Sequence, residues 1–177
     1  MGIKQRSFTM IELMVVISII LILTAVTIYS LGPARAKSRD SRRIVDANLI
    51  MNAVNQYYTS NLRTYPTRNL PDVTDTRYYA VVVNNSSFLA NSAIVSNYLG
   101  GQLPTDPINN SGYRYVYIYR GDGKKAAVVV DKLESMTNKC NTGGANVPDA
   151  VKAYLTGDNL APGSLGENPN ACYFVAS

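Results

Sequence analysis

An apolar run from Phe8 to Leu31 dominates the N-terminus and limits what this chain can fold into. Its roughly two dozen residues exceed the about 20 that an α-helix needs to cross a bilayer. Glu12 is the only formally charged residue within the run. A carboxylate inside the hydrocarbon costs on the order of 2 to 3 kcal/mol, so we expect this acid to have a function and a partner.

A cleaved secretory signal is the simplest alternative interpretation of the same stretch. Lys4 and Arg6 would form its positive segment, but the apolar run is longer than the usual roughly 7 to 15 residues. The small-x-small sequence that follows, Ala34-Arg35-Ala36, lies inside a basic segment. A permanent transmembrane helix over 8–31, preceded by a leader over 1–7, fits better.

The residues at the start of the run carry a family resemblance. Ser7 followed by Phe8-Thr9-Met10-Ile11-Glu12-Leu13 resembles the processing site of type IV prepilins and type II secretion pseudopilins. In that family a membrane peptidase cuts before the Phe and methylates the new amine. The resemblance therefore implies cleavage between Ser7 and Phe8, N-methylation of Phe8, and filament assembly through Phe8 and Glu12.

A filament would give the acid its partner. When subunits stack, Glu12 of one helix can pair with the terminal amine of a neighbour, so that one contact offsets two desolvation penalties. The expected partners are identical or related pilin subunits in a helical homopolymer, the prepilin peptidase, and the assembly machinery of the inner membrane. The chain would be a single-pass inner-membrane protein first and a surface or extracellular filament subunit after assembly.

The filament hypothesis does not say whether the filament serves adhesion, motility, DNA uptake or secretion. The alternative function, from another class of protein, is a monomeric membrane-anchored binding module, such as an adhesin or a DNA receptor. Glu12 separates the two, because a simple anchor has no evident use for an acid in its span.

The expected fold is α+β, with the long N-terminal helix packed on a small antiparallel sheet. Pro33 predicts a kink, after which an amphipathic helix continues over 32–60. Its apolar stripe has helical spacing and consists of Ile44, Ala47, Ile50, Met51, Val54, Tyr57 and Tyr58.

A globular head over 61–134 is expected to contain the sheet. Alternation over 113–119 predicts a strand with its tyrosines on one face, 126–133 predicts a second strand, and Gly121-Asp122-Gly123 predicts the hairpin turn between them. A short apolar run covers 78–83, and a helix is expected near 90–99. Several short motifs here resemble pilins related to the type II major pseudopilin, among them Thr64-Tyr65-Pro66 and Lys132-Leu133-Glu134.

A basic segment follows the span, with five cations against Asp40 alone: Arg35, Lys37, Arg39, Arg42 and Arg43. The positive-inside rule applied to it argues for the opposite orientation to that of pilins, whereas the processing motif and the cysteines argue for an exported head. The segment could contact anionic lipid, acids of a neighbouring subunit, or DNA, although nothing else in the sequence supports a nucleic acid. A solvated helix face is the favoured reading for most of these residues.

Cys140 and Cys172 are expected to form a disulfide, because two thiols in an exported domain usually pair. They close a C-terminal loop region over 135–177, which is rich in Gly, Asn and Pro and has one expected helical turn over 148–155.

The sequence gives no sign of catalysis, a cofactor or a metal. It has no His, no Gly-rich phosphate loop and no nucleophile elbow. The calcium loop of related pseudopilins is not recognisable here, and Asp122 and Asp131 alone fall short of a calcium cage. Arg120-Gly121-Asp122 matches a known adhesion tripeptide, but a hairpin turn selects the same residues.

Overall fold

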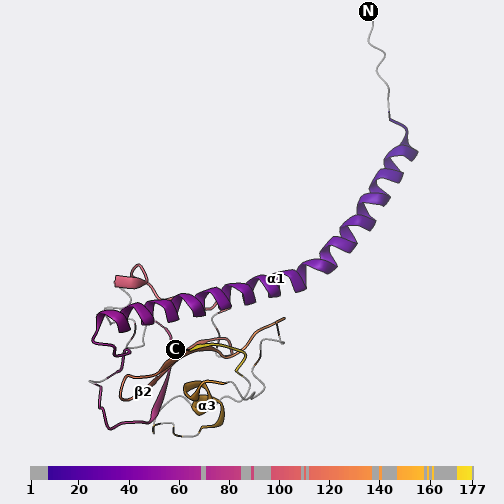
Figure 1. Cartoon of the computed structure of the whole chain (residues 1–177). Coiled ribbons are helices and arrows are strands. Elements are labelled where there is room, and N and C mark those ends of the chain that lie inside the picture. Colours follow the sequence, from indigo (N-terminus) through magenta and orange to yellow (C-terminus); the bar gives the residue numbers. More distant parts are fainter. Residues whose placement is uncertain are drawn as a thin grey trace, which may run out of the picture.

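The computed structural model describes residues 8–68, 71–84, 89, 97–108, 110, 112–136, 140, 147–157, 159, 161 and 171–176. Figure 1 shows a long helix, α1, whose first half projects from the head and whose second half lies across one face of a sheet. The fold is α+β, as predicted.

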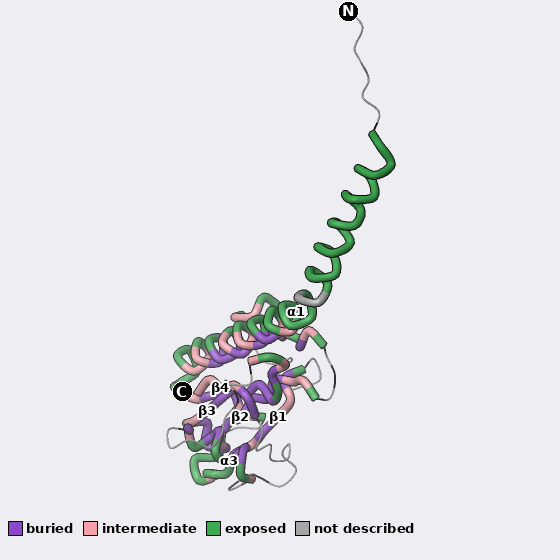
Figure 2. Tube along the Cα trace, turned by 90° about the vertical axis from the view of Figure 1, so that its right-hand side faces the viewer, coloured by how far each residue is buried: buried purple, intermediate pink, exposed green. Residues whose placement is uncertain are grey.

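Helix α1 runs without a break over Met10–Ser60 and contains Pro33. Proline lacks the backbone N–H that would donate within the helix, and a bend is expected near it. The axis of α1 does bend between the projecting half and the half that lies on the head (Figure 1). Only one face of the second half is buried (Figure 2). That face includes Ala47, Ile50, Met51 and Val54, which confirms the predicted stripe.

The sheet has four antiparallel strands in the order β1-β2-β3-β4. Their bounds are Tyr78–Val82, Tyr115–Arg120, Ala126–Val130 and Tyr173–Ala176. Strand β2 begins two residues later than predicted, and β3 ends at Val130 rather than at residue 133. A short helix, α3, covers Asp149–Thr156, one residue later than the expected helical turn over 148–155.

Two helices cover opposite faces of the sheet, so the head has three layers (Figure 1). Tyr115, Tyr117 and Tyr119 of β2 pack on the side of α1, whereas Val116 and Ile118 pack on the side of α3. Successive side chains of a strand point to opposite faces, and both faces are covered here. The residues of β2 from Tyr115 to Tyr119 are therefore all apolar or aromatic, and the charged Arg120 stands at the end of the strand. The tyrosines share one face of the strand, as predicted, and that face packs against the long helix.

The turn between β2 and β3 has the hairpin geometry expected for it. The Gly123 N–H donates to the Arg120 carbonyl at 2.8 Å, and Gly123 has a φ of 68°, which favours glycine. Arg120 and Asp122 also pair with each other, Nη2 to Oδ2, at 2.6 Å, and Asp122 is buried. The tripeptide is thus occupied within the turn, which supports the turn reading over an adhesion signal.

Strand β4 is an addition to the sequence-based picture. It pairs with β3 and lies directly after Cys172, whose N–H donates to the Val130 carbonyl at 2.9 Å. Residues 173–176 are therefore part of the sheet. The expected helix near 90–99 falls mostly outside the described residues.

Candidate functional site

The projecting half of α1 is an exposed apolar surface. Its large apolar side chains between Met10 and Leu31 are 43% to 84% exposed. By length and composition this is the one helix, among the described residues, that could cross a membrane. An apolar helix of this length and exposure fits a membrane-anchored protein.

Three polar side chains within this half are satisfied by their own helix. The hydroxyl groups of Ser18, Thr24 and Thr27 donate to the carbonyls four residues earlier, at 2.7, 2.7 and 2.8 Å. Lipid offers no hydrogen-bonding partners, so polar groups in a span must be satisfied internally. These residues therefore interrupt the apolar run without preventing insertion.

Glu12 closes a capping box at the start of the helix. Its carboxylate accepts from the Thr9 backbone N–H at 2.9 Å and from the Thr9 hydroxyl at 2.8 Å. The Glu12 N–H in turn donates to the Thr9 hydroxyl oxygen at 3.4 Å, and Thr9 is the N-cap residue. Two otherwise unpaired N–H groups of the first turn are thus satisfied.

This contact was missed at the sequence level, although Thr9-Met10-Ile11-Glu12 is the S/T-x-x-E pattern that signals a capping box. A simple anchor does gain from Glu12, because the acid caps its own helix, so the presence of the acid alone does not separate a filament subunit from a monomeric anchor.

Phe8 lies at the same tip as Glu12, one residue before the capping Thr9, and is 82% exposed. Cleavage before Phe8 would place a new amine beside the carboxylate that Thr9 holds. Ser7, the residue before the expected cut, lies outside the described residues.

Arg43 fastens the second half of α1 to the head. Its side chain is fully buried and donates to Asp106 at 2.6 Å, Asp40 at 2.7 Å and Glu134 at 2.6 Å. The guanidinium also lies 4.4 Å from the centre of the Tyr113 ring. One cation therefore joins the helix to two segments that are distant in sequence.

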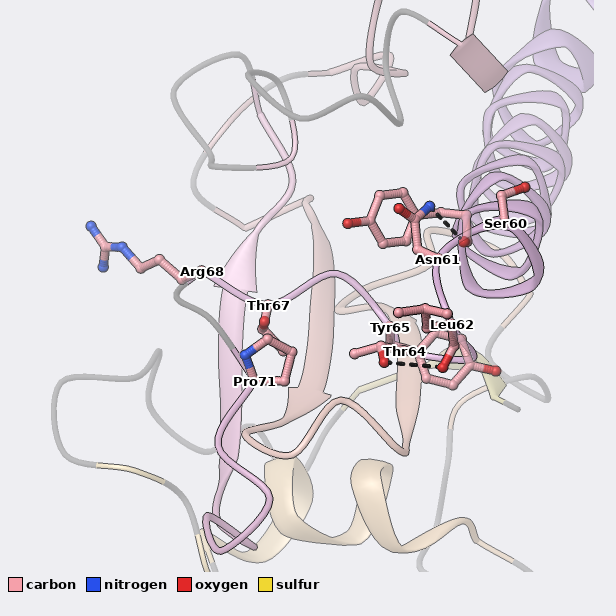
Figure 3. Close-up of a pocket in the computed structure, with 9 residues that line it drawn as sticks. Ser60, Asn61, Leu62, Thr64, Tyr65, Thr67, Arg68 and Pro71 are labelled. Atoms are coloured by element: carbon pink, nitrogen blue, oxygen red, sulfur yellow. Dashed lines mark hydrogen bonds between the residues drawn. The ribbon is translucent and has the colours of Figure 1, made fainter.

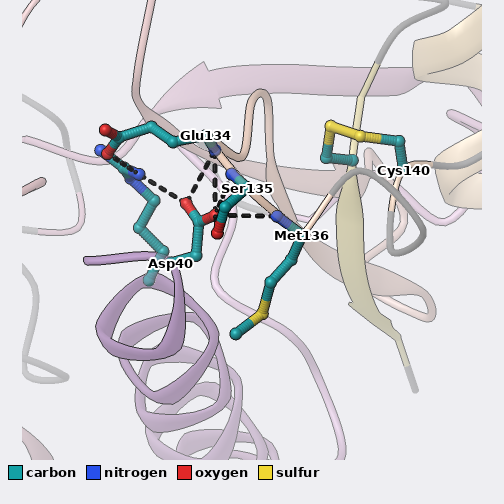
Figure 4. Close-up of a disulfide and its surroundings, with 7 residues drawn as sticks. Asp40, Glu134, Ser135, Met136 and Cys140 are labelled. Carbon is teal, nitrogen blue, oxygen red and sulfur yellow. Dashed lines mark hydrogen bonds and ion pairs between the residues drawn. A yellow bond between two sulfur atoms is a disulfide. The ribbon is translucent and has the colours of Figure 1, made fainter. Parts of the chain in front are cut away.

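Asp40 completes the same cluster from the preceding helical turn (Figure 4). Its carboxylate accepts from the backbone N–H groups of Glu134, Ser135 and Met136 at 2.6 to 3.0 Å. Burial alone would raise the pKa of Asp40, but these donors and Arg43 lower the pKa below its ordinary value. The Arg39 and Arg43 guanidinium groups likewise lower the pKa of Glu134. We call Asp40, Arg43, Asp106 and Glu134 the clamp.

The clamp should make the head sensitive to acid. Because the pKa values of Asp40 and Glu134 are lower in the folded state, the unfolded chain takes up protons first as the pH falls. Their contribution is complete above the ordinary values of about 3.9 and about 4.3, and is lost below them. Burial raises the pKa of Asp46, which acts in the opposite sense.

We therefore expect the thermal midpoint of the head to fall between about pH 4 and about pH 2, where Asp40 and Glu134 take up protons. Near-ultraviolet circular dichroism of the tyrosines, recorded on the full chain in detergent, would measure it. A midpoint that does not change over this range would mean that the clamp carboxylates do not stabilise the head.

The basic segment divides into two sets. Arg35, Lys37 and Arg42 are exposed, as the solvated-face reading predicted. That reading is wrong for Arg43, which is buried in the clamp, and for Arg39, which is half-buried and pairs with Glu134 at 2.5 Å. The acids that bind these two residues lie far away in the sequence, so local charge counting could not find them.

The predicted disulfide between Cys140 and Cys172 is present. It joins the segment that follows the clamp to the start of β4, and Figure 4 shows it beyond Met136. The two acids considered as metal ligands are engaged elsewhere: Asp122 pairs with Arg120, and Asp131 with Arg114 and the Tyr154 hydroxyl. Within the described part of the chain, no group of three or more His, Cys, Asp or Glu side chains could hold a metal ion.

A groove of about 550 Å³ lies at the opposite end of α1 from Glu12. Figure 3 shows it between the end of the helix and the following loop, with Arg68 directed away from it. The lining combines aromatic, aliphatic and polar side chains: Tyr57, Ser60, Asn61, Leu62, Thr64, Tyr65, Thr67, Arg68 and Pro71. Leu62 is 97% exposed at this end of the molecule.

Residues 3–28 match the family model described as the prokaryotic N-terminal methylation motif. Searches of curated proteins and of solved structures each find no match to the chain. The match covers most of the leader, the capping box and most of the apolar run, which include the processing-site residues that carried the resemblance.

The chain therefore has the leader signature of type IV pilins and pseudopilins. This motif indicates a type IV pilin-like or pseudopilin protein, which is a structural class. It implies pilin subunits and a prepilin peptidase as general partners.

Proposed function

We propose that this protein is a filament subunit that a prepilin peptidase processes between Ser7 and Phe8 and that polymerises through its projecting helix. The observation that carries the proposal is the tip of α1. An apolar, exposed helix inside the methylation motif presents a single carboxylate beside the residue that would become the N-terminus.

The capping box supports the proposal in a way that the sequence alone did not suggest. Thr9 holds the Glu12 carboxylate with two hydrogen bonds, so its orientation is fixed before any neighbour arrives. A carboxylate can accept more than two hydrogen bonds, so a neighbour's amine can pair with it without breaking the cap. The subunit would then be preorganised for assembly, which lowers the entropy cost of the contact.

The clamp supports the same function at the other half of the helix. A filament subunit must transmit force between its helix and its head, and the clamp joins the two through buried, charge-assisted hydrogen bonds. Strand β4 and the disulfide hold the end of the chain in the same head.

The test is the state of the protein on the cell surface. We expect shearing of cells to release part of the protein in a fraction that sediments as polymer. Intact-mass analysis of that fraction should give a chain that starts at Phe8 and carries one added methyl group. Polymer that retains Met1 would overturn the proposed processing.

The second candidate is the monomeric membrane-anchored binding module. The groove at the far end of α1 favours it, because its volume is within the about 300 to 1,000 Å³ typical of ligand sites. Under this reading the protein stays in the membrane fraction after shearing, so the same experiment separates the two candidates.

A further inference from the structure

Two of the five cations of the basic segment form no ion pair with the residues that the structure describes. Arg39 and Arg43 pair with head acids, and Arg42 lies 3.8 Å from Asp46. Arg35 and Lys37 are exposed, and among the residues that the structure describes neither forms an ion pair. The fold therefore separates these two from the other basic residues of α1.

Their position along the helix is distinctive. The exposed apolar surface of the projecting half ends at Leu31. Arg35 and Lys37 follow four and six residues later, about 6 and about 9 Å farther along α1 at 1.5 Å per residue. A bilayer adds roughly 5 to 8 Å of headgroup region on each side of its hydrocarbon core, so the backbone of Arg35 lies within the headgroup layer. The backbone of Lys37 lies just beyond that layer, and its long side chain can reach back to it because helical side chains tilt toward the N-terminus.

We propose that Arg35 and Lys37 bind the phosphates of anionic lipids on the side of the membrane that holds the head. The guanidinium donates hydrogen bonds to phosphate oxygens in a bidentate manner, and the ammonium acts as a compact point charge. The two residues lie on different sides of the helix, because two steps of 100° separate them. They therefore engage different lipid molecules around the helix.

The contact belongs to the subunit while it is in the membrane, and it holds whether or not the chain polymerises. Each basic residue near an anionic surface strengthens binding by about fivefold, so the pair should favour anionic over zwitterionic lipid by about 25-fold. The attraction is electrostatic and should weaken as the salt concentration rises.

The experiment compares lipid preference in the full-length protein. Wild type and Arg35→Gln/Lys37→Gln would be exposed to equal amounts of phosphatidylglycerol and phosphatidylethanolamine in detergent, and bound lipids counted by native mass spectrometry. The matched control, Arg63→Gln/Lys152→Gln, removes the same charge from exposed positions in the head. Near-ultraviolet circular dichroism would confirm that all three heads are folded.

We expect wild type and the control to retain a preference for phosphatidylglycerol and the Arg35/Lys37 variant to lose most of it. The proposal is overturned if that variant keeps the wild-type preference, or if the control loses as much. It is also overturned if the two cations prove to be required instead for binding a double-stranded DNA oligonucleotide by protein held in zwitterionic nanodiscs.

Discussion

Glu12→Ala should abolish filament assembly while leaving membrane insertion and head folding intact. Removal of the carboxylate eases insertion, because an acid in the span is costly. It also leaves the Phe8 amine of each neighbouring subunit unpaired in a low-dielectric core, at a cost of about 3 to 5 kcal/mol per subunit. The measurement is the ratio of sheared polymer to membrane-pool protein.

The capping box requires a control that separates its role from that of the ion pair. Glu12→Gln keeps a side chain that can complete the box with Thr9, but it removes the charge. We expect it to fail in assembly nearly as completely as Glu12→Ala, whereas Glu12→Asp, whose shorter side chain keeps the charge, retains partial assembly. Normal filaments from Glu12→Gln would show that capping suffices and that the proposed ion pair is wrong.

Arg43→Met should destabilise the head by about 3 to 5 kcal/mol, the usual cost of removing one partner from a buried ionic cluster. The change leaves Asp40, Asp106 and Glu134 without their shared cation. Arg43→Lys should fall in between, because an ammonium cannot reproduce the planar fork that contacts three carboxylates. Denaturant unfolding of the full chain in detergent, followed by the tyrosine signal, would give the free energies.

The matched control is Arg42→Met, one residue away on the exposed face. Its weak contact with Asp46 at 3.8 Å should contribute at most about 1 kcal/mol. If Arg43→Met cost no more than Arg42→Met, the clamp would not hold the helix on the head.

Local patterns predicted the elements better than they predicted their contacts. The spacing of Ile50, Met51 and Val54 and the alternation of Tyr115, Tyr117 and Tyr119 each identify a buried face, because helix and strand periodicity are properties of the chain itself. The covering of the two faces of the sheet by α1 and α3 was not predicted. It depends on the pairing of β4 with β3, which joins segments that are distant in sequence.

Among the charged residues too, contacts between neighbours in sequence could be predicted and contacts between distant residues could not. The role of Arg43 depends on Asp106 and Glu134, which are 63 and 91 positions away in sequence, so no local pattern could reveal it. The capping of Glu12 by Thr9 depends on residues three positions apart and could have been found. The disulfide was accessible because the chain has only two Cys to pair.

The most direct test of the central claim is immunogold electron microscopy of cells that express an epitope-tagged copy. If the protein is a filament subunit, the label should decorate surface filaments along their length, and these labelled filaments should be absent with Glu12→Ala. Label confined to the cell envelope, in cells whose protein is processed at Phe8 and present at normal levels, would contradict the account.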